Sequence, residues 1–279
     1  MELSRIDAHQ HFWKIERGDY GWITPELPVL HRDYLPGDLR PHLEKHRLDG
    51  SIAVQAAPTL EETAYLLSLA ESDDSVLGVV GWLDLQDPRH MEYYESFASH
   101  PKYVGFRIMI QEMPDAGAVL EPAFVEGLRA YASRGVPVDL LVTAGQLEPV
   151  IELVRQVPGL RGVIDHIAKP RIKEGVEEPW RGQIERLASF PNLYCKLSGM
   201  TTEADREAWR PEQFAPYVRH VLECFGPDRV MYGSDWPVCL LAATYDEVVG
   251  VLESALPDSW GETEKKKLYG LNAKEFYRL

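Results

Sequence analysis

The chain contains 279 residues, of which 45% are hydrophobic and 26% charged, an ordinary balance for a soluble globular enzyme. Its 44 acidic and 29 basic residues give a net charge of −15, and such a surface repels the phosphate backbone of nucleic acids. No apolar run approaches the ~18 residues of a membrane span, and residues 1–5 do not begin a signal peptide. Three widely spaced cysteines fit a reducing compartment. We therefore expect a cytoplasmic enzyme with neither nucleic acid nor a membrane as partner.

Short apolar runs alternate with segments of helical periodicity along the chain, and glycine or proline marks most of the joins. The expected strands are Arg5–His11, Ser51–Ala57, Val76–Leu85, Tyr103–Ile110, Val136–Val142, Gly162–Lys169, Asn192–Ser198 and Arg229–Ser234. The expected helices are Pro36–Arg47, Leu60–Ser72, Glu121–Arg134, Gln146–Val157, Glu177–Ser189, Pro211–Phe225, Tyr245–Ala255 and Glu262–Tyr277.

Strands that alternate with helices indicate parallel βαβ units. Eight such units predict an α/β fold, a single (β/α)8 barrel of the TIM type that spans residues 1–279 as one domain. An open doubly wound sheet is the alternative, although no strand is followed by the G-x-G-x-x-G turn of a dinucleotide site.

The segment Phe12–Leu35 interrupts the regular alternation after the first strand. It is long and contains aromatic residues and prolines. Loops that follow barrel strands lie on the catalytic face, so we expect this insertion to form a lid or one wall of a pocket.

Polar or aromatic residues stand at the end of nearly every expected strand. Barrel active sites are built from these ends, and burying a polar group costs free energy unless the group is hydrogen-bonded. The pattern therefore predicts a polar pocket, although single members could be structural. In chain order the residues are His9, His11, Gln55, Trp82, Asp84, Arg107, Asp139, His166, Lys196 and Asp235.

The most informative motif is His9-Gln10-His11 in the first strand. Side chains alternate along a strand, so His9 and His11 face the same side and could reach one metal ion. The alternative is ordinary pocket lining. Asp235 ends the eighth strand, which neighbours the first in a closed barrel, so it could bind that metal or accept a proton from an attacking water. Alternatively, Asp235 is a turn or N-cap residue before Pro237.

Other strand ends supply further candidates. His166 could be another metal ligand or could orient the water, although a lone histidine is more often structural. Arg107 should point inward and polarise a carbonyl. Lys169 and Lys196 could act similarly, although a salt-bridged lysine at a barrel rim is equally common, and tryptophans could equally be core residues. The residues that we expect to contact the substrate are Trp22, Gln55, Trp82, Lys169 and Trp236.

Other catalytic motifs are missing from the sequence. A G-x-S-x-G elbow, a C-x-x-C pair and an H-E-x-x-H helix are all absent. Cys195 and Cys239 lie near the expected site without an assigned base, so we interpret them as small buried residues. The remaining histidines are expected to be surface or structural residues: His31, His42, His46, His90, His100 and His220.

In combination, these segments resemble the amidohydrolase-2 group of the amidohydrolase superfamily, specifically its sugar-lactonase branch. The resemblance covers residues 3–279 and implies that His9, His11, His166 and Asp235 occupy the family's active-site positions. Members look like hydrolases of L-fuconolactone, L-rhamnonolactone and related aldonolactones. The matching segments are RIDAHQHFW (5–13), GDYGWI (18–23), VQAAPT (54–59), VIDHIAKP (163–170), KLSGM (196–200) and YGSDWP (232–237).

One departure from the wider superfamily concerns the metal. Members with two metals usually carry a bridging lysine or glutamate on the fourth strand and a histidine on the fifth, where this chain has Arg107 and Asp139. The resemblance therefore implies one divalent ion, for which zinc suits the nitrogen-rich ligands. It also leaves open that no metal is required, since related lactonases look able to work without one.

The expected reaction is hydrolysis of a sugar lactone to its aldonic acid. Asp235 would deprotonate a water that attacks the lactone carbonyl, and a metal or Arg107 would stabilise the oxyanion. His166 would orient the water or protonate the leaving ring oxygen. The nearest alternative is a metal-dependent decarboxylase of the same superfamily that acts on an aromatic acid, and another is a barrel that binds a sugar acid without catalysis. The sequence leaves the oligomeric state open, although a homodimer is the commonest soluble assembly.

Overall fold

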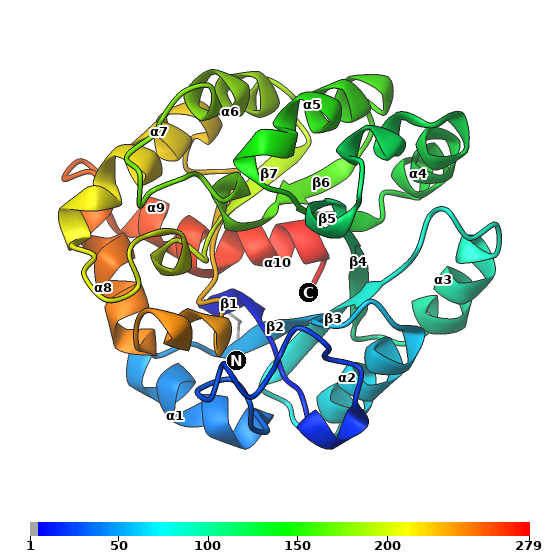
Figure 1. Ribbon diagram of the computed structural model, residues 1–279, viewed down its shortest axis with the longest axis horizontal. Coiled ribbons are helices and arrows are strands. Elements are labelled where there is room, and N and C mark those ends of the chain that lie inside the picture. Colours follow the sequence, from blue (N-terminus) through cyan, green and yellow to red (C-terminus); the bar gives the residue numbers. More distant parts are fainter. Residues whose placement is uncertain (1–4) are drawn as a thin grey trace.

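Eight parallel strands form a barrel surrounded by helices in the computed structural model, which describes residues 5–279 (Figure 1). Residues 1–4, on which the expectation of no signal peptide partly rests, lie outside the described residues. Neighbouring strands pair in chain order from β1 to β8. This order confirms the predicted α/β barrel of the TIM type.

The eight strands agree with the expected runs to within a few residues at most ends. They are β1 (Ile6–Gln10), β2 (Gly50–Val54), β3 (Val76–Trp82), β4 (Tyr103–Met109), β5 (Pro137–Leu141), β6 (Arg161–Ile164), β7 (Leu193–Leu197) and β8 (Val230–Tyr232).

The helices likewise follow the predicted periodicity, with one addition that it did not single out, α3. They are α1 (Pro36–His46), α2 (Leu60–Ser72), α3 (His90–Ala98), α4 (Pro122–Arg134), α5 (Leu147–Gln156), α6 (Trp180–Ala188), α7 (Ala215–Phe225), α8 (Tyr245–Ala255), α9 (Glu262–Lys266) and α10 (Asn272–Tyr277). The expected helix 262–277 is α9 and α10 joined by a π-helical turn.

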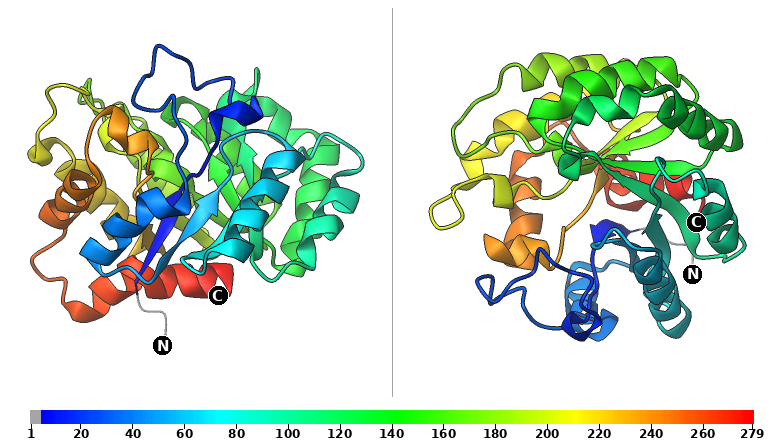
Figure 2. Two further views of the ribbon diagram at one scale, coloured as in Figure 1. Left: turned by 90° about the horizontal axis from the view of Figure 1, so that it is seen from below. Right: turned by 45° about the vertical axis from the view of Figure 1, so that its right-hand side comes forward.

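Apolar side chains fill one end of the barrel and leave the other end to polar groups. Helix α10 lies across the end opposite the insertion, as the left view of Figure 2 shows. Its residues Phe276 and Tyr277 pack against strand residues that point inward. These strand residues are Ile6, Ala8, Ile52, Val54, Val80, Val163 and Met231. Burial of these apolar residues stabilises the strands through the hydrophobic effect, and the same strands carry the polar site at the other end of the barrel.

The insertion 12–35 forms a loop closed on itself at the C-terminal end of the barrel (Figure 2). Its two ends are joined by reciprocal backbone hydrogen bonds of 3.0 Å between Trp13 and Tyr34. The buried indole of Trp13 also donates to the carbonyl oxygen of Arg32 at 2.8 Å. These bonds hold the loop in a defined shape beside the strand ends.

The barrel closes where β1 meets β8. The backbone N–H of His11 donates to the carbonyl of Trp236 at 2.7 Å, and the N–H of Asp235 donates to the carbonyl of His9 at 2.9 Å. The carboxylate of Asp7 accepts the N–H of Ser234 at 2.9 Å. The first and last strands are therefore joined by bonds that involve the site residues themselves.

Two further sequence expectations concern the cysteines and the membrane. Cys195 and Cys239 are buried and unpaired, as predicted. Among the helices of residues 5–279, none combines the length and the apolar character needed to cross a bilayer.

Candidate active site

A bulge in β1 determines where its two histidines point. The pairing of β1 with β2 shifts by one residue between Asp7 and Gln10, so β1 contains an extra residue there. Ile6 and Ala8 pack inside the barrel, and strict alternation after them would turn His9 outward. The extra residue brings His9 back to the interior. The H-x-H spacing predicted a shared face correctly, but the bulge decides that this face is the inner one.

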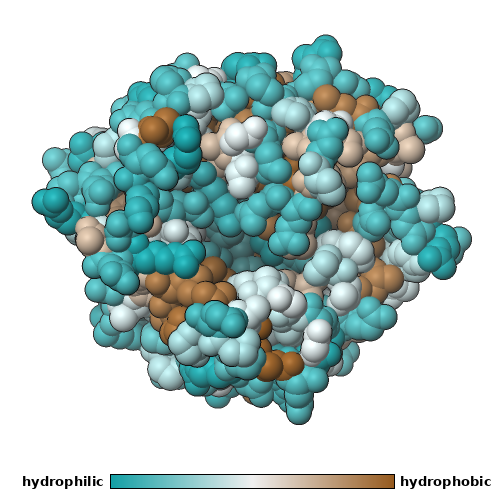
Figure 3. All heavy atoms as spheres, in the orientation of Figure 1, coloured by the Kyte–Doolittle hydropathy of each residue, from teal (hydrophilic) through white to brown (hydrophobic). Residues whose placement is uncertain are grey.

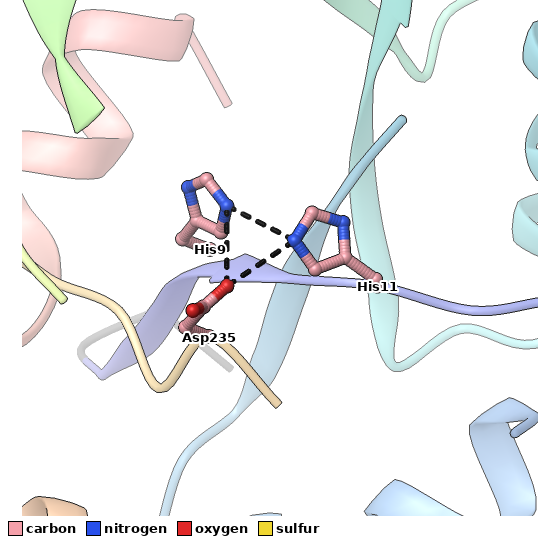
Figure 4. Close-up of side chains that lie close together, drawn as sticks. All are labelled: His9, His11 and Asp235. Atoms are coloured by element: carbon pink, nitrogen blue, oxygen red, sulfur yellow. Dashed lines mark hydrogen bonds and ion pairs between the residues drawn. The ribbon is translucent and has the colours of Figure 1, made fainter. Parts of the chain in front are cut away.

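The side chains of His9, His11 and Asp235 converge at the end of the barrel (Figure 4). Nε2 of His9 lies 3.2 Å from Nε2 of His11. Oδ1 of Asp235 lies 3.3 Å from Nε2 of His11 and 3.8 Å from Nε2 of His9. Zinc ligands bound at ~2.0–2.1 Å in a tetrahedron are about 3.3 Å apart. The three residues therefore fit one zinc ion, and all three are buried.

The other ring nitrogen of each histidine also has a partner. Nδ1 of His11 lies 2.8 Å from the carbonyl oxygen of Val54, which requires that Nδ1 carry the proton. Nδ1 of His9 lies 3.3 Å from Oδ1 of Asp165. Partners of this kind fix the ring and leave Nε2 free to bind a metal. Asp165 was not singled out by the sequence analysis, although it precedes His166 in a quoted segment.

His166 lies on a left-handed turn that corrects the expected sixth strand. We expected that strand to continue to Lys169, but β6 ends at Ile164. Positive φ angles of 53°, 49°, 60° and 46° follow at residues 166–169. Left-handed backbone costs roughly 1–2 kcal/mol per non-glycine residue, and more where the side chain is β-branched as in Ile167. This strained turn places both His166 and Lys169 in the wall of the pocket.

Two glycines make room for the site histidines. A Cβ atom on Gly199, whose φ is +61°, would lie 2.4 Å from Nδ1 of His166. A Cβ atom on Gly233 would lie 2.6 Å from Cβ of His9. The hydroxyl of Ser198 then holds Nδ1 of His166 at 2.9 Å. Both glycines stand in the quoted segments, but sequence reasoning gave them no role because the facing ring belongs to a distant strand.

The pKa values of the buried groups indicate that His9 and His166 are neutral and that Asp235 is ionised. Burial lowers the pKa of His9 and of His166 well below the ordinary value, so both rings are neutral at pH 7. Burial raises the pKa of Asp235, but its histidine neighbours His166 and His11 outweigh burial, and the net pKa is lowered. Asp235 is therefore a carboxylate, ready to bind a cation or to accept a proton.

Arg107 is held rigidly by Gln55. Its Nε donates to Oε1 of Gln55 at 2.6 Å, and one Nη donates to the backbone carbonyl of the same residue. The other Nη lies 3.4 Å from the carboxylate of Asp165. Two of the five guanidinium N–H groups remain available to the pocket. Gln55 is fully buried and lies behind Arg107, outside the pocket lining.

Glu62 in α2 is a buried carboxylate that the sequence analysis did not identify. It accepts the backbone N–H of Ala56 at 2.9 Å and that of Ala57 at 2.7 Å. Burial raises its pKa to about 7 despite these donors. The only sequence signal was Thr59-x-x-Glu62, an ordinary N-terminal helix pattern in which Thr59 caps α2. Through these bonds Glu62 fixes the backbone that follows β2, the segment that contains Gln55.

The converging groups face a pocket of about 200 Å3. Figure 3 shows a hollow in the middle of this face, with hydrophilic residues in its floor and hydrophobic residues on part of its rim. The pocket is below the ~300–1,000 Å3 of typical ligand sites, which suits one small molecule. Its lining residues are His11, Trp22, Ala56, Arg107, Met109, Gln111, Glu112, Leu141, His166, Lys169, Asp235 and Val238.

The three tryptophans expected at the substrate take different positions. Trp22 forms part of the pocket wall from the insertion, with its indole N–H 2.9 Å from the carbonyl of Ala56 and 37% of its surface exposed. Trp236 is buried against the rings of Phe12 and Tyr34. Trp82 is half-buried in β3 and lies outside the pocket lining. The insertion is thus a pocket wall through Trp22.

Comparison with known proteins places the chain in a family. The profile of the Amidohydrolase family matches residues 6–279. The chain belongs to this family. An L-fucono-1,5-lactonase of Burkholderia multivorans is 39% identical over an alignment of 292 positions, which covers 100% of this chain and 97% of that protein. An L-rhamnono-gamma-lactonase of Scheffersomyces stipitis is 29% identical over 63% of this chain and 59% of that protein.

The solved structures agree with this assignment. A crystal structure of an amidohydrolase from Burkholderia multivorans with bound zinc matches this amidohydrolase with a TM-score of 0.93 and 38% identity over 99% of both chains. The resemblance seen in the sequence is thereby confirmed at the level of family and fold.

Proposed function

We propose that this amidohydrolase is a lactonase that opens L-fucono-1,5-lactone or a closely related aldonolactone. The observation that carries the proposal is the carboxylate of Asp235, which faces a monosaccharide-sized pocket within 3.9 Å of Nε2 of both His11 and His166. The full-length similarity to an L-fucono-1,5-lactonase supports this substrate class.

Asp235 and His166 activate the water in this proposal. The carboxylate takes a proton from water while the water oxygen attacks the lactone carbonyl carbon. Nδ1 of His166 is held by Ser198, so its Nε2 faces Asp235 and orients the water. The bond between the carbonyl carbon and the ring oxygen then breaks, and the proton passes from Asp235 to the departing oxygen. The products are the aldonic acid and a regenerated carboxylate.

Arg107 stabilises the oxyanion that develops on the carbonyl oxygen. Its fork is fixed by Gln55 and Asp165, so the donors are oriented before the substrate arrives. A zinc ion held by His9, His11 and Asp235 would supply Lewis-acid polarisation of the same carbonyl. Lys169 adds a further positive charge to the pocket wall.

The pocket lining offers groups for both the apolar and the polar parts of a deoxy-sugar lactone. Trp22, Met109, Leu141 and Val238 are apolar members of the lining, which suit a methyl group and the C–H face of a sugar ring. Oε1 of Gln111 is buried without a hydrogen-bond partner among the described residues. A substrate hydroxyl would satisfy that oxygen, since an unpaired buried acceptor costs free energy.

Acid release on a panel of lactones tests the proposal. A pH indicator should report rapid proton release with L-fucono-1,5-lactone and slower release with D-configured lactones. Release of carbon dioxide from hydroxybenzoic acids, with no acid release from any lactone, would replace the lactonase by a decarboxylase. Thermal stabilisation by aldonic acids without turnover of any substrate would indicate a binding protein.

A further inference from the structure

The described residues contain two groups that could hold a metal ion, and His9 belongs to both. The first group is the one in Figure 4, in which His9 offers Nε2. The second joins His9 to Asp165 and His166, whose ligand atoms lie within 4.8 Å of one another. Nδ1 of His9 and Oδ1 of Asp165 are 3.3 Å apart, the spacing expected for two ligands of one zinc ion. Ligands for a second metal ion are therefore present.

A lysine ammonium already stands beside these ligands. Nζ of Lys196, from β7, lies 3.2 Å from Nδ1 of His9 and 3.2 Å from Oδ1 of Asp165. It also donates a short hydrogen bond to Asp139 in β5, and its side chain is fully buried. Lysine is almost never fully buried unless it is paired, and here its N–H groups face the carboxylates of Asp139 and Asp165, while the protonated Nδ1 of His9 faces Asp165 and leaves Nε2 free for a metal ion.

The buried charges balance without a second ion. Asp139 and Asp165 supply two carboxyl groups, and Lys196 and Arg107 supply two basic groups paired with them, with Arg107 3.4 Å from Asp165. A divalent ion added beside Lys196 would place like charges within a few ångströms in a site with little water, which is strongly unfavourable. The first position differs, because there the carboxylate of Asp235 faces the two histidines of β1.

We propose that the Lys196 ammonium takes the place of a second metal ion, so that the site holds one ion and His9 binds it through Nε2 only. The missing bridging residue on the fourth strand is then not what limits the site to one metal. This inference deepens the proposed function and rests on its metal site. It assigns Lys196 a positioning role, because its charge keeps Asp165 oriented toward Nδ1 of His9.

Replacing the ammonium by an uncharged chain of similar length tests the proposal. Lys196→Met vacates the second position, so the variant should bind one more equivalent of zinc per chain than the wild-type protein, with Nδ1 of His9 releasing its proton to solvent as it binds the second ion. The zinc content is measured by atomic spectroscopy after saturation and gel filtration, in the absence of any lactone. Failure of lactone turnover would thus leave this measurement intact.

A matched control removes the same charge from another side of the pocket. Lys169→Met should leave the zinc content of the wild-type protein unchanged, because Lys169 faces Glu203 at 4.0 Å and not the second group. An equal gain in both variants would overturn the proposal, since a general change in pocket charge would then explain it.

A second variant protects the test against misfolding, because Lys196→Met leaves Asp139 without its cation. The double variant Lys196→Met with Asp139→Asn removes the pair together and keeps His9, Asp165 and His166. It should also gain one equivalent of zinc. The proposal is overturned if neither folded variant gains an ion, or if the wild-type protein itself binds two zinc ions at saturation.

Discussion

The hydroxyl of Tyr277 in α10 donates a 2.8 Å hydrogen bond to Oδ1 of Asp139 in β5. Tyr277 enters the barrel from the end opposite the pocket, and Asp139 is the partner of Lys196. The C-terminal helix is thus connected to the buried charges beneath the active site by a single chain of polar contacts. A substitution in α10, at the closed end of the barrel, should therefore affect the charged groups beneath the active site.

Tyr277→Phe should lower the free energy of unfolding by about 1–3 kcal/mol, because Asp139 loses a donor in a buried site. Guanidinium unfolding measures the effect. The control is Tyr269→Phe, since the buried hydroxyl of Tyr269 has no hydrogen-bond partner among the described residues. Equal losses in the two variants would contradict a specific role for the Tyr277 hydroxyl.

Asp235→Asn should lower kcat by a factor of about 10²–10⁴, the usual contribution of a general base. An amide cannot take the proton of the attacking water. Asp84→Asn provides the control, because Asp84 also follows a barrel strand but is exposed and lies outside the pocket lining. Near-wild-type turnover by Asp235→Asn, in a folded protein, would remove Asp235 from the mechanism.

Gly199→Ala should lower kcat/KM by about 100-fold, because its Cβ would displace the His166 ring by the order of an ångström. Gly175→Ala separates this clash from backbone strain. Gly175 has a similar φ of +63°, but a Cβ there would meet no described atom within 4 Å. It should cost roughly 1–2 kcal/mol of stability and leave turnover unchanged. Equal activity of the two variants would show that His166 tolerates the displacement.

Glu62→Gln should flatten the dependence of stability on pH. The folded-state pKa of Glu62, raised by burial to about 7, lies above its ordinary value of 4.5. A raised pKa means that the folded protein binds the proton more tightly than the unfolded chain does. The stability contributed by this group is therefore complete below pH 4.5 and is lost as the pH rises through about 7.

This loss is on the order of 3 kcal/mol, since each pKa unit corresponds to ~1.4 kcal/mol. The difference in unfolding free energy between wild type and Glu62→Gln should change by that amount between pH 4 and pH 8. Glu61→Gln, on an exposed position of the same helix, controls for the removal of a carboxylate. A constant difference across this range would contradict the buried-acid assignment.

Zinc should raise the unfolding temperature of the metal-free protein, because an ion bound only to the folded state stabilises it by mass action. The gain is ~2.7 kcal/mol at a zinc concentration 100 times the Kd. Differential scanning fluorimetry before and after chelation measures it. His11→Ala should abolish the shift, whereas alteration of the exposed His31 to alanine should preserve it. A shift that persists in His11→Ala would place the ion elsewhere.

The barrel and most of its pocket were predictable from the sequence because their signals are local. Apolar runs of strand length recur eight times, and polar residues end them. His11, Arg107, His166, Lys169 and Asp235 line the pocket as a result. This reasoning needs no knowledge of side-chain contacts, since parallel strands bring their ends together.

The remaining features depend on contacts between distant strands. The bulge of β1 is visible only in its register with β2. The left-handed turn at His166 contradicts the β-propensity of Ile167 and exists because the surrounding structure holds it. Lys196 resembled an ordinary rim lysine until its neighbours in β1 and β5 were known. Trp236 resembled a ligand-binding aromatic, but its ring packs into the core.

The closure of the barrel between β1 and β8 also has a consequence for the synthesis of the protein. The two histidines that could bind a metal, His9 and His11, precede Asp235 by more than two hundred residues, so they leave the ribosome well before it. A nascent chain therefore carries both imidazoles without the carboxylate that completes their site. Hydrolysis can begin only after β8 has paired with β1, so activity itself reports that the barrel has closed.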